Sequence, residues 1–282
     1  MSQPPDPRPD WSQERQPDPP NFGKATLLSE RSLERWARRR RRKARRVLDR
    51  DTQICSFEPG LVSLVVLSCK RLPELRRLCQ TLVPFFDDVE DYSKIEKLLI
   101  DNGSGDELVG YARGLGFFDE VVAHPVNLGM PAALDDAYRR ARGEFVLLVE
   151  DDFLIDYDRP FLARTVELLD EHPEIGIVRL KNQNNWWKPF RRIGPLRRTS
   201  SGTEFWTWVP SRTRTWNVWA AGSVLFRKVS YFDSGRMPTR GRRSGAVLYE
   251  HVFGRRYNRT WLAAKVKDVQ PFVQPNDNAP AA

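Results

Sequence analysis

The sequence predicts an α/β protein with a mostly parallel central sheet and helices on both faces of that sheet. Short apolar, β-branched segments alternate with segments of helical spacing along most of the chain. Polar loops rich in Gly, Asp and Asn directly follow several of the apolar segments. This alternation indicates right-handed βαβ units, in which ligands bind at the carboxyl ends of the strands.

The first predicted element is the apolar segment 61–67, whose valines and leucines are typical of a buried parallel strand. The leucine spacing that follows it predicts a helix. Continuing in order, we expect strands at 61–67, 97–100, 119–124, 144–149 and 175–180, and helices at 73–82, 107–115, 130–142 and 159–171.

The pattern changes after residue 180. Residues 183–219 are rich in Trp, Arg, Thr and Asn and are typical of loops, whereas 218–227 is a further ordered stretch. A helix at 246–257 and an ordered segment at 261–266 complete the body. We therefore expect a disordered Pro-rich tail at 1–26, a basic helical arm at 27–56, a folded domain at 57–270 and a second tail at 271–282.

The positive charge is concentrated at one end of the chain. Net charge is +9 over 282 residues, and residues 1–50 hold 14 Lys and Arg against 7 Asp and Glu. The body is nearly neutral and lacks the common nucleic-acid-binding patterns, so nucleic acid is an unlikely partner. There is no apolar stretch of about 20 residues, no visible secretory signal and no CxxC pair, which together predict a reduced, cytoplasmic protein.

The basic arm contains six consecutive cations at residues 38–43, within a segment without Gly or Pro. An uneven apolar stripe accompanies them, so 31–50 is expected to form a basic amphipathic helix. Two interpretations stay open. The helix is a solvated connection to the domain, or it docks on an anionic membrane surface or a protein partner, which would make the protein membrane-peripheral.

Three acids, Glu150, Asp151 and Asp152, directly follow the strand at 144–149. Their mutual repulsion favours a divalent cation, and hard carboxylate oxygens suit Mg²⁺ or Mn²⁺. The alternative is that these acids cap the next helix or pair with arginines. Two further loops, the Asx-rich turn at 101–106 and the segment 127–133 leading into a helix, offer a carboxylate and free backbone N–H groups.

Taken in order, these motifs resemble the family 2 type glycosyltransferases with the GT-A fold. The resembling segments are 62–71, 99–106, 127–135, 143–152, 221–227 and 249–251. The resemblance implies a nucleotide-sugar half at 57–180 and an acceptor half at 181–270. It also implies metal-dependent, inverting transfer of a sugar from a nucleotide-diphosphate sugar, by default a UDP-sugar, to a hydroxyl of a glycan, glycolipid or small-molecule aglycone.

The resemblance also assigns roles to residues. Glu150 and Asp152 would hold Mn²⁺ or Mg²⁺, and Glu250 or His251 would act as the catalytic base. Glu150 replaces the family's first Asp, and His251 replaces the Asp of its Glu-Asp pair. Contacts to the nucleotide sugar would come from Ser68, Lys70, Arg71, Asp101, Asn127, Gly129, Asp135 and Asp151.

The acceptor is expected to lie near Gly222 and near tryptophans, whose faces stack on sugars and apolar aglycones. Six of them fall between the donor half and the base: Trp186, Trp187, Trp206, Trp208, Trp216 and Trp219. The alternative is a hydrophobic cluster that holds a long loop. The competing function is a non-catalytic protein, or one that binds nucleic acid or an anionic surface through the Arg-rich arm. A nucleotidyltransferase is disfavoured because residues 67–73 contain no glycine.

Overall fold

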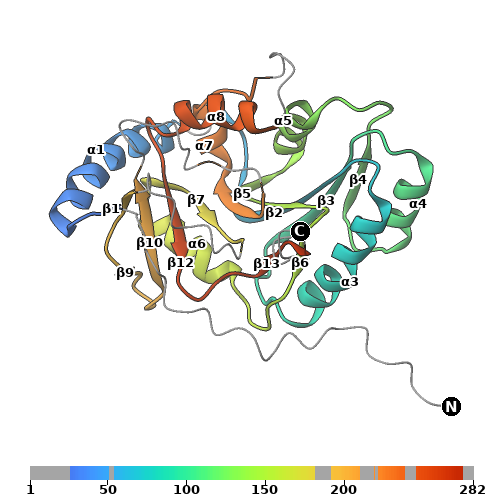
Figure 1. The fold of residues 1–282 in the computed structure, drawn as a ribbon, viewed down its shortest axis with the longest axis horizontal. Coiled ribbons are helices and arrows are strands. Elements are labelled where there is room, and N and C mark those ends of the chain that lie inside the picture. The colour runs from blue at the N-terminus through green and yellow to red at the C-terminus, as the bar shows by residue number, and fades with distance from the viewer. Residues whose placement is uncertain are drawn as a thin grey trace, which may run out of the picture.

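The computed structural model describes residues 26–50, 54–181, 192–209, 219, 222–238 and 246–275, which form a large sheet with helices on both faces (Figure 1). The strand order is β1-β8-β10-β12-β7-β11-β5-β2-β3-β4, and β9 pairs with β10. The predicted α/β class is therefore confirmed. The predicted tail at the N-terminus and the end of the C-terminal tail lie outside the described residues.

The elements have the following bounds. The strands are β1 Thr26–Leu27, β2 Glu58–Ser68, β3 Ile95–Asp101, β4 Glu120–Ala123, β5 Gly143–Glu150, β6 Leu154–Ile155, β7 Ile175–Arg179, β8 Arg192–Ile193, β9 Arg197–Arg198, β10 Glu204–Val209, β11 Val224–Arg227, β12 Leu262–Val266 and β13 Phe272–Val273. The helices are α1 Glu30–Leu48, α3 Leu72–Asp88, α4 Asp106–Gly114, α5 Met130–Arg140, α6 Leu162–Glu171, α7 Lys228–Asp233 and α8 Ala246–Tyr257.

All the central strands except β11 run in one direction. β4, β3, β2 and β5 pair in parallel, β7 and β12 pair in parallel, and β11 joins the two groups by pairing antiparallel to both β5 and β7. Ser68 stands opposite Asp101 and Leu67 opposite Glu150, so β2, β3 and β5 end at the same level. Their loops therefore meet at one edge of the sheet, as predicted for a site.

Each face of the sheet has its own hydrophobic core. Along β2, Leu64 and Val66 pack in the cluster on the side of α3, α4 and α6. Val65 and Leu67 pack in the cluster that includes residues of α1, α5, α7 and α8. This alternation follows from the two-residue period of a strand, and because both faces are covered the strand is apolar throughout.

Two expectations about the second half of the chain were wrong. The segment 183–219 was expected to be loop-like, but β10 lies within it as a six-residue strand that pairs with β12, β8 and β9. The C-terminal tail was expected to start at 271, but β13 pairs antiparallel with β6. Each strand has a partner that is distant in sequence, β12 for β10 and β6 for β13, which local patterns do not reveal.

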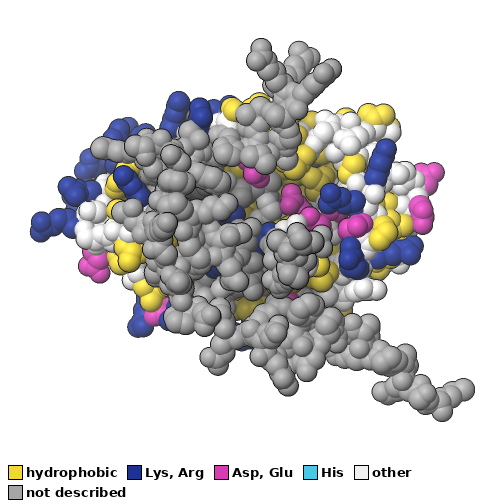
Figure 2. All heavy atoms as spheres, in the orientation of Figure 1, with side chains coloured by type: hydrophobic (Ala, Val, Ile, Leu, Met, Phe, Trp, Pro, Cys, Tyr) yellow, Lys and Arg dark blue, Asp and Glu magenta, His cyan; other side chains and the backbone are white. Residues whose placement is uncertain are grey.

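The basic helix α1 forms as predicted, but it is packed on the body rather than standing apart as an arm. Leu33, Ala37, Ala44 and Val47 are buried, and the Leu33 side chain fills the space where a side chain at Gly194 would lie. Lysine and arginine side chains gather at the margin of the molecule where α1 lies (Figure 2). Within the described ranges, no helix is both long and apolar enough to cross a bilayer.

Polar contacts fasten α1 to the body. Arg41 donates from Nε and Nη2 to the two carboxylate oxygens of Glu174, each at 3.0 Å, and the Glu174 side chain is fully buried. Arg40 donates to the backbone oxygen of Asn258 at 2.7 Å. Burial opposes ionisation of Glu174, but the hydrogen bond and the charge of Arg41 outweigh it, so the pKa of Glu174 lies below its ordinary value.

We expect Arg41→Ala to lower the free energy of unfolding at pH 7 by roughly 2–3 kcal/mol, because Glu174 would be left charged and buried. A carboxyl group with a depressed folded pKa stabilises the fold above its unfolded pKa, and this contribution is lost as pH falls through the folded pKa. The difference between variant and wild type in urea denaturation should therefore shrink in acid. Arg42→Ala, on the neighbouring exposed residue, serves as control and should change little.

Candidate active site

The turn after β3 is built around Asp101. Its side chain is 1% exposed, and both carboxylate oxygens accept the backbone N–H of Ser104, at 3.1 and 3.0 Å. The Ser104 hydroxyl in turn accepts the backbone N–H of Lys70, at 2.6 Å, from the loop after β2. The carboxylate that was expected to contact a nucleobase thus holds two loops together.

The loop before α5 is docked on the same turn. A Cβ atom at Gly103 would lie 2.5 Å from the backbone nitrogen of Asn127, and φ of Gly103 is +82°, so only glycine fits there. The buried Asn102 side chain donates to Asn127 Oδ1 at 3.1 Å and accepts from Leu128 N at 2.9 Å. Gly129 N also donates to Asn127 Oδ1, at 2.7 Å. Asn127 and Gly129 therefore form the entry to α5, in contact with the β3 turn.

Asp151 links the ends of β2 and β5. Its buried carboxylate accepts from Ser68 Oγ at 2.7 Å and from Arg71 Nη1 at 3.4 Å. Burial raises the pKa of Asp151, although the bond from Ser68 and the charge of Arg71 counteract this. Lys70 has a left-handed backbone (φ 56°) and an exposed side chain. Ser68, Arg71 and Asp151 thus form one internal network, while Lys70 is left facing solvent.

The two acids expected to hold a metal are less well compensated. Asp152 Oδ2 accepts from Gln274 Nε2 at 2.7 Å, but its Oδ1 is buried and receives no hydrogen bond from the described residues. Burial and the neighbouring charges of Asp152, Glu250 and Asp151 raise the pKa of Glu150 to about 7, while Lys181 counteracts them. A cation between Glu150 and Asp152 would give Asp152 Oδ1 a partner and would offset the repulsion that raises the pKa of Glu150.

These residues fit a hard divalent cation. Carboxylate oxygens are the ligands of Mg²⁺ and Mn²⁺, and the buried Asp152 Oδ1 lacks a partner. Within the described part of the chain, no three acidic, His or Cys side chains converge into a complete ligand set. The remaining ligands would then be substrate phosphates and water, as is common for Mg²⁺ held by one or two carboxylates.

Gly222 and Glu250 adjoin the same acids. A Cβ atom at Gly222 would lie 3.1 Å from Glu150 Oε2 and 3.3 Å from the Phe153 ring, so a side chain there would press on the Glu150 carboxylate. Glu250, on α8, is close enough for its charge to raise the pKa of Glu150. The structure therefore brings the predicted base and Gly222 to the acids that were predicted to bind the metal. The His251 side chain lies outside what the structure describes.

Asp135 is occupied by contacts within the protein. Its carboxylate accepts from Arg139 Nε at 2.9 Å and from the Tyr231 hydroxyl at 3.2 Å, and Arg236 lies 3.7 Å away. It lies on α5, which begins at the loop of Asn127 and Gly129. The resemblance assigned a contact to the nucleotide sugar to Asp135, which stays a prediction, and the structure shows that this residue also ties α5 to α7.

Two of the tryptophans predicted to stack on an acceptor, Trp208 and Trp219, are buried. Trp219 is 2% exposed and packs against Phe253 and Tyr257, with ring centroids 4.8 and 5.0 Å apart. Trp208 is buried on β10, whereas Trp206 on the same face is half-buried. The prediction of acceptor contact is therefore wrong for Trp219 and Trp208, whose indoles pack in the hydrophobic core. Trp186, Trp187 and Trp216 lie outside the described residues.

Sequence patterns missed three residues near the acids. Gln274 reaches Asp152 from the C-terminal segment, and Lys181 Nζ donates to Gln274 Oε1. The Tyr138 hydroxyl is buried without a hydrogen bond from the described residues. Burial raises its pKa well above the ordinary value, with smaller contributions from Tyr231, Glu150 and Glu250. Of the three, only Lys181 could have been found from the sequence, because it directly follows the predicted strand 175–180.

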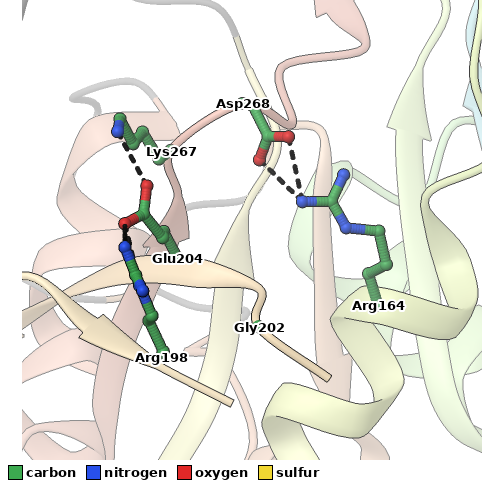
Figure 3. Close-up of a pocket in the computed structure, with 6 residues that line it drawn as sticks. All are labelled: Arg164, Arg198, Gly202, Glu204, Lys267 and Asp268. Carbon is green, nitrogen blue, oxygen red and sulfur yellow. Dashed lines mark hydrogen bonds and ion pairs between the residues drawn. The ribbon is translucent and has the colours of Figure 1, made fainter. Parts of the chain in front are cut away.

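A separate polar pocket of about 310 Å³ lies where β9, β10, α6 and the end of β12 meet (Figure 3). Its cations are already paired. Arg198 and Lys267 both bind Glu204, at 2.7 Å, and Arg164 binds both oxygens of Asp268, at 2.8 and 2.9 Å. It contains none of the predicted site residues, and its charges are largely satisfied.

Comparisons with known proteins agree with this geometry. A search of curated protein sequences gave no match. Among solved structures, the chain is similar to residues 1–349 of TarS from S. aureus (TM-score 0.54, 17% identity, 76% of this chain and 60% of that TarS segment). It is also similar to the mannosyltransferase PcManGT from Pyrobaculum calidifontis, solved with GDP-Man and Mn²⁺ (TM-score 0.52, 20% identity, 83% of this chain and 62% of PcManGT). The chain thus spans less than two thirds of either protein.

At these identities the structural likeness shows the fold, which is the GT-A fold that the motifs predicted. Family membership is shown by the sequence. The family model described as "Glycosyl transferase family 2" matches residues 63–228, from within β2 to the start of α7. The match therefore covers the loops that follow β2, β3 and β5, including the three acids 150–152. The chain therefore belongs to glycosyl transferase family 2.

Proposed function

We propose that this protein is a metal-dependent, inverting glycosyltransferase that moves a sugar from a nucleotide-diphosphate sugar to a hydroxyl acceptor. The observation that carries the proposal is the partly uncompensated pair Glu150 and Asp152, placed at the carboxyl end of β5 beside Glu250. Family 2 membership and the GT-A fold support the same reaction class.

The donor would bind over the ends of β2, β3 and β5. Asp152 and Glu150 would hold Mn²⁺ or Mg²⁺, whose chemistry when bound is neutralisation of charge on the leaving diphosphate. Gln274 orients Asp152 by donating to Oδ2, which leaves Oδ1 available. The network of Ser68, Arg71 and Asp151 keeps the loop after β2 against the acids.

Glu250 is our candidate base. In the transfer step, the acceptor hydroxyl oxygen attacks the anomeric carbon as the bond from that carbon to the phosphate oxygen breaks. The nucleoside diphosphate leaves with the bonding electrons, the Glu250 carboxylate accepts the hydroxyl proton, and the anomeric configuration inverts. His251, next along α8, is the alternative base.

A UDP-sugar is the first donor to test. TarS has been solved with UDP-GlcNAc and PcManGT with GDP-Man and Mn²⁺, so uridine and guanosine donors both occur on this fold. The acceptor half contains Gly222 and the half-buried Trp206, which remain candidates for acceptor contact. A glycan, a glycolipid or a small aglycone would each satisfy the chemistry.

Manganese should stabilise the protein. With Mn²⁺ at about 100 times its Kd, we expect a gain of about 2.7 kcal/mol in thermal unfolding, because the ion binds the folded state alone. Asp152→Asn should remove most of this gain. Asp158→Asn, on an exposed acid six residues away, should keep it. An unchanged gain in Asp152→Asn would exclude Asp152 as a ligand.

Gln274→Ala should weaken Mn²⁺ binding by on the order of tenfold, as expected when a group that orients a metal ligand is removed. The measurement is calorimetric titration, so it does not depend on turnover. The control is Gln270→Ala, in the same segment, because the Gln270 amide contacts Lys265 and not an acid. Equal affinities in the two variants would contradict the role given to Gln274.

Release of a nucleoside diphosphate from UDP-, GDP- and dTDP-sugars should occur with Mn²⁺ and stop with EDTA. Glu250→Gln should bind the donor normally but lose transfer by about 10²–10⁴-fold, the usual contribution of a general base. Glu107→Gln, on an exposed acid of α4, is the control. Metal-independent turnover would refute the proposed mechanism, and full activity of Glu250→Gln would leave His251 as the base.

A further inference from the structure

We propose that the outer face of α1 docks the protein on an anionic lipid bilayer by charge alone, without insertion of the helix. The helix has 19 residues and is therefore about 28 Å long. Its exposed arginines are Arg31, Arg35, Arg38, Arg39, Arg42, Arg45 and Arg46. At about 100° per residue these seven fall within a sector of about 120°.

That sector lies directly opposite the buried stripe of Leu33, Ala37, Ala44 and Val47. The two acids of the helix, Glu30 and Glu34, fall outside it. Among the described residues none of the seven arginines forms an ion pair, whereas Arg41, at the border of the sector, pairs with Glu174 and Glu34. Within the described residues, the outer face is therefore a cationic stripe without ion pairs.

The structure decides how such a helix can meet a membrane. An amphipathic helix normally binds a bilayer by burying its apolar face among the acyl chains. Here that face is packed on the sheet and fastened by Arg40 and Arg41. The surface of α1 that a partner can contact is a row of guanidinium groups. Each contributes about 1 kcal/mol of binding free energy near an anionic membrane surface.

The composition of the stripe favours lipid over other anionic partners. Proteins that bind single-stranded nucleic acid interleave basic residues with exposed aromatic rings. The only aromatic residue of α1, Trp36, is half-buried, and the Arg40 guanidinium covers its ring at 4.4 Å. A stable protein interface has an apolar centre, and this stripe has none. A flat layer of phosphate headgroups needs neither feature.

The position of α1 also suits catalysis at a surface. α1 lies on the same face of the sheet as α8, which carries Glu250 (Figure 1). Basic side chains follow the margin of the molecule along α1 (Figure 2). Docking would therefore turn the face of the sheet that carries α1 and α8 toward the bilayer. The proposal stands on α1 alone, so it does not depend on the proposed reaction.

The test is co-sedimentation of the full chain with vesicles of phosphatidylcholine, with and without phosphatidylglycerol. We expect binding only to the anionic vesicles, and weaker binding as salt rises. The triple variant Arg38→Gln, Arg42→Gln, Arg45→Gln should lower the partition coefficient by on the order of 100-fold. The control triple Lys94→Gln, Arg113→Gln, Arg159→Gln removes the same charge from exposed residues of other elements and should keep binding.

Three results would overturn the proposal. They are equal binding to neutral vesicles, equal loss in both triple variants, and binding of duplex DNA or RNA at a salt concentration at which anionic vesicles do not bind. The salt titration of the wild-type chain needs no variant, so it is informative even if a variant folds poorly. No activity is measured, so failure here leaves the proposed reaction untouched.

Discussion

Repulsion among the carboxylates at the end of β5 is the constraint around which the site is arranged. Three consecutive acids follow a buried strand, and Glu250 approaches them from α8. The protein compensates each acid differently. Asp151 is bonded to Ser68 and Arg71, Asp152 is half satisfied by Gln274, and Glu150 has its pKa raised to about 7. The compensation is incomplete where a cation would bind.

This incomplete compensation explains why distant segments converge on β5. The loop after β2 brings Arg71, the segment before β11 brings Gly222, and the C-terminal segment brings Gln274. Lys181, at the end of β7, contacts Gln274 and counteracts the rise in the Glu150 pKa. A substitution in any of these segments would change the surroundings of the acids, although Gln274 lies 124 residues from Glu150 in the chain.

The second organising contact is the packing of α1 on the sheet. A helix with this many arginines would be expected in solvent, yet its apolar stripe and the bonds from Arg41 to Glu174 make it part of the body. The buried Glu174 carboxylate is balanced mainly by Arg41, with Arg197 3.8 Å away. The same packing turns the remaining arginines outward, which is why the cationic stripe is both rigid and exposed.

Most of the parallel strands, and the loops that follow them, could be predicted from sequence because each depends on local patterns. The strand 61–67, the turn at 101–106 and the acids at 150–152 were all located in this way. β10 was missed because its Trp and Thr residues resemble those of the loops around it, and it is stabilised by pairing with β12. The role of Trp219 was misjudged, and the partners of Asp135 were not foreseen, because burial and partners depend on contacts across the fold.

The sequence by itself therefore determined the fold class, the family and the position of the acids that the proposed reaction uses, since strand periodicity and loop composition are local properties. Only the tertiary structure decided that Gln274 completes the acid site, that Trp219 belongs to the core, and that the basic segment is a docked helix. The physical reason is that burial, ion pairing and pKa depend on which distant residues become neighbours when the sheet forms.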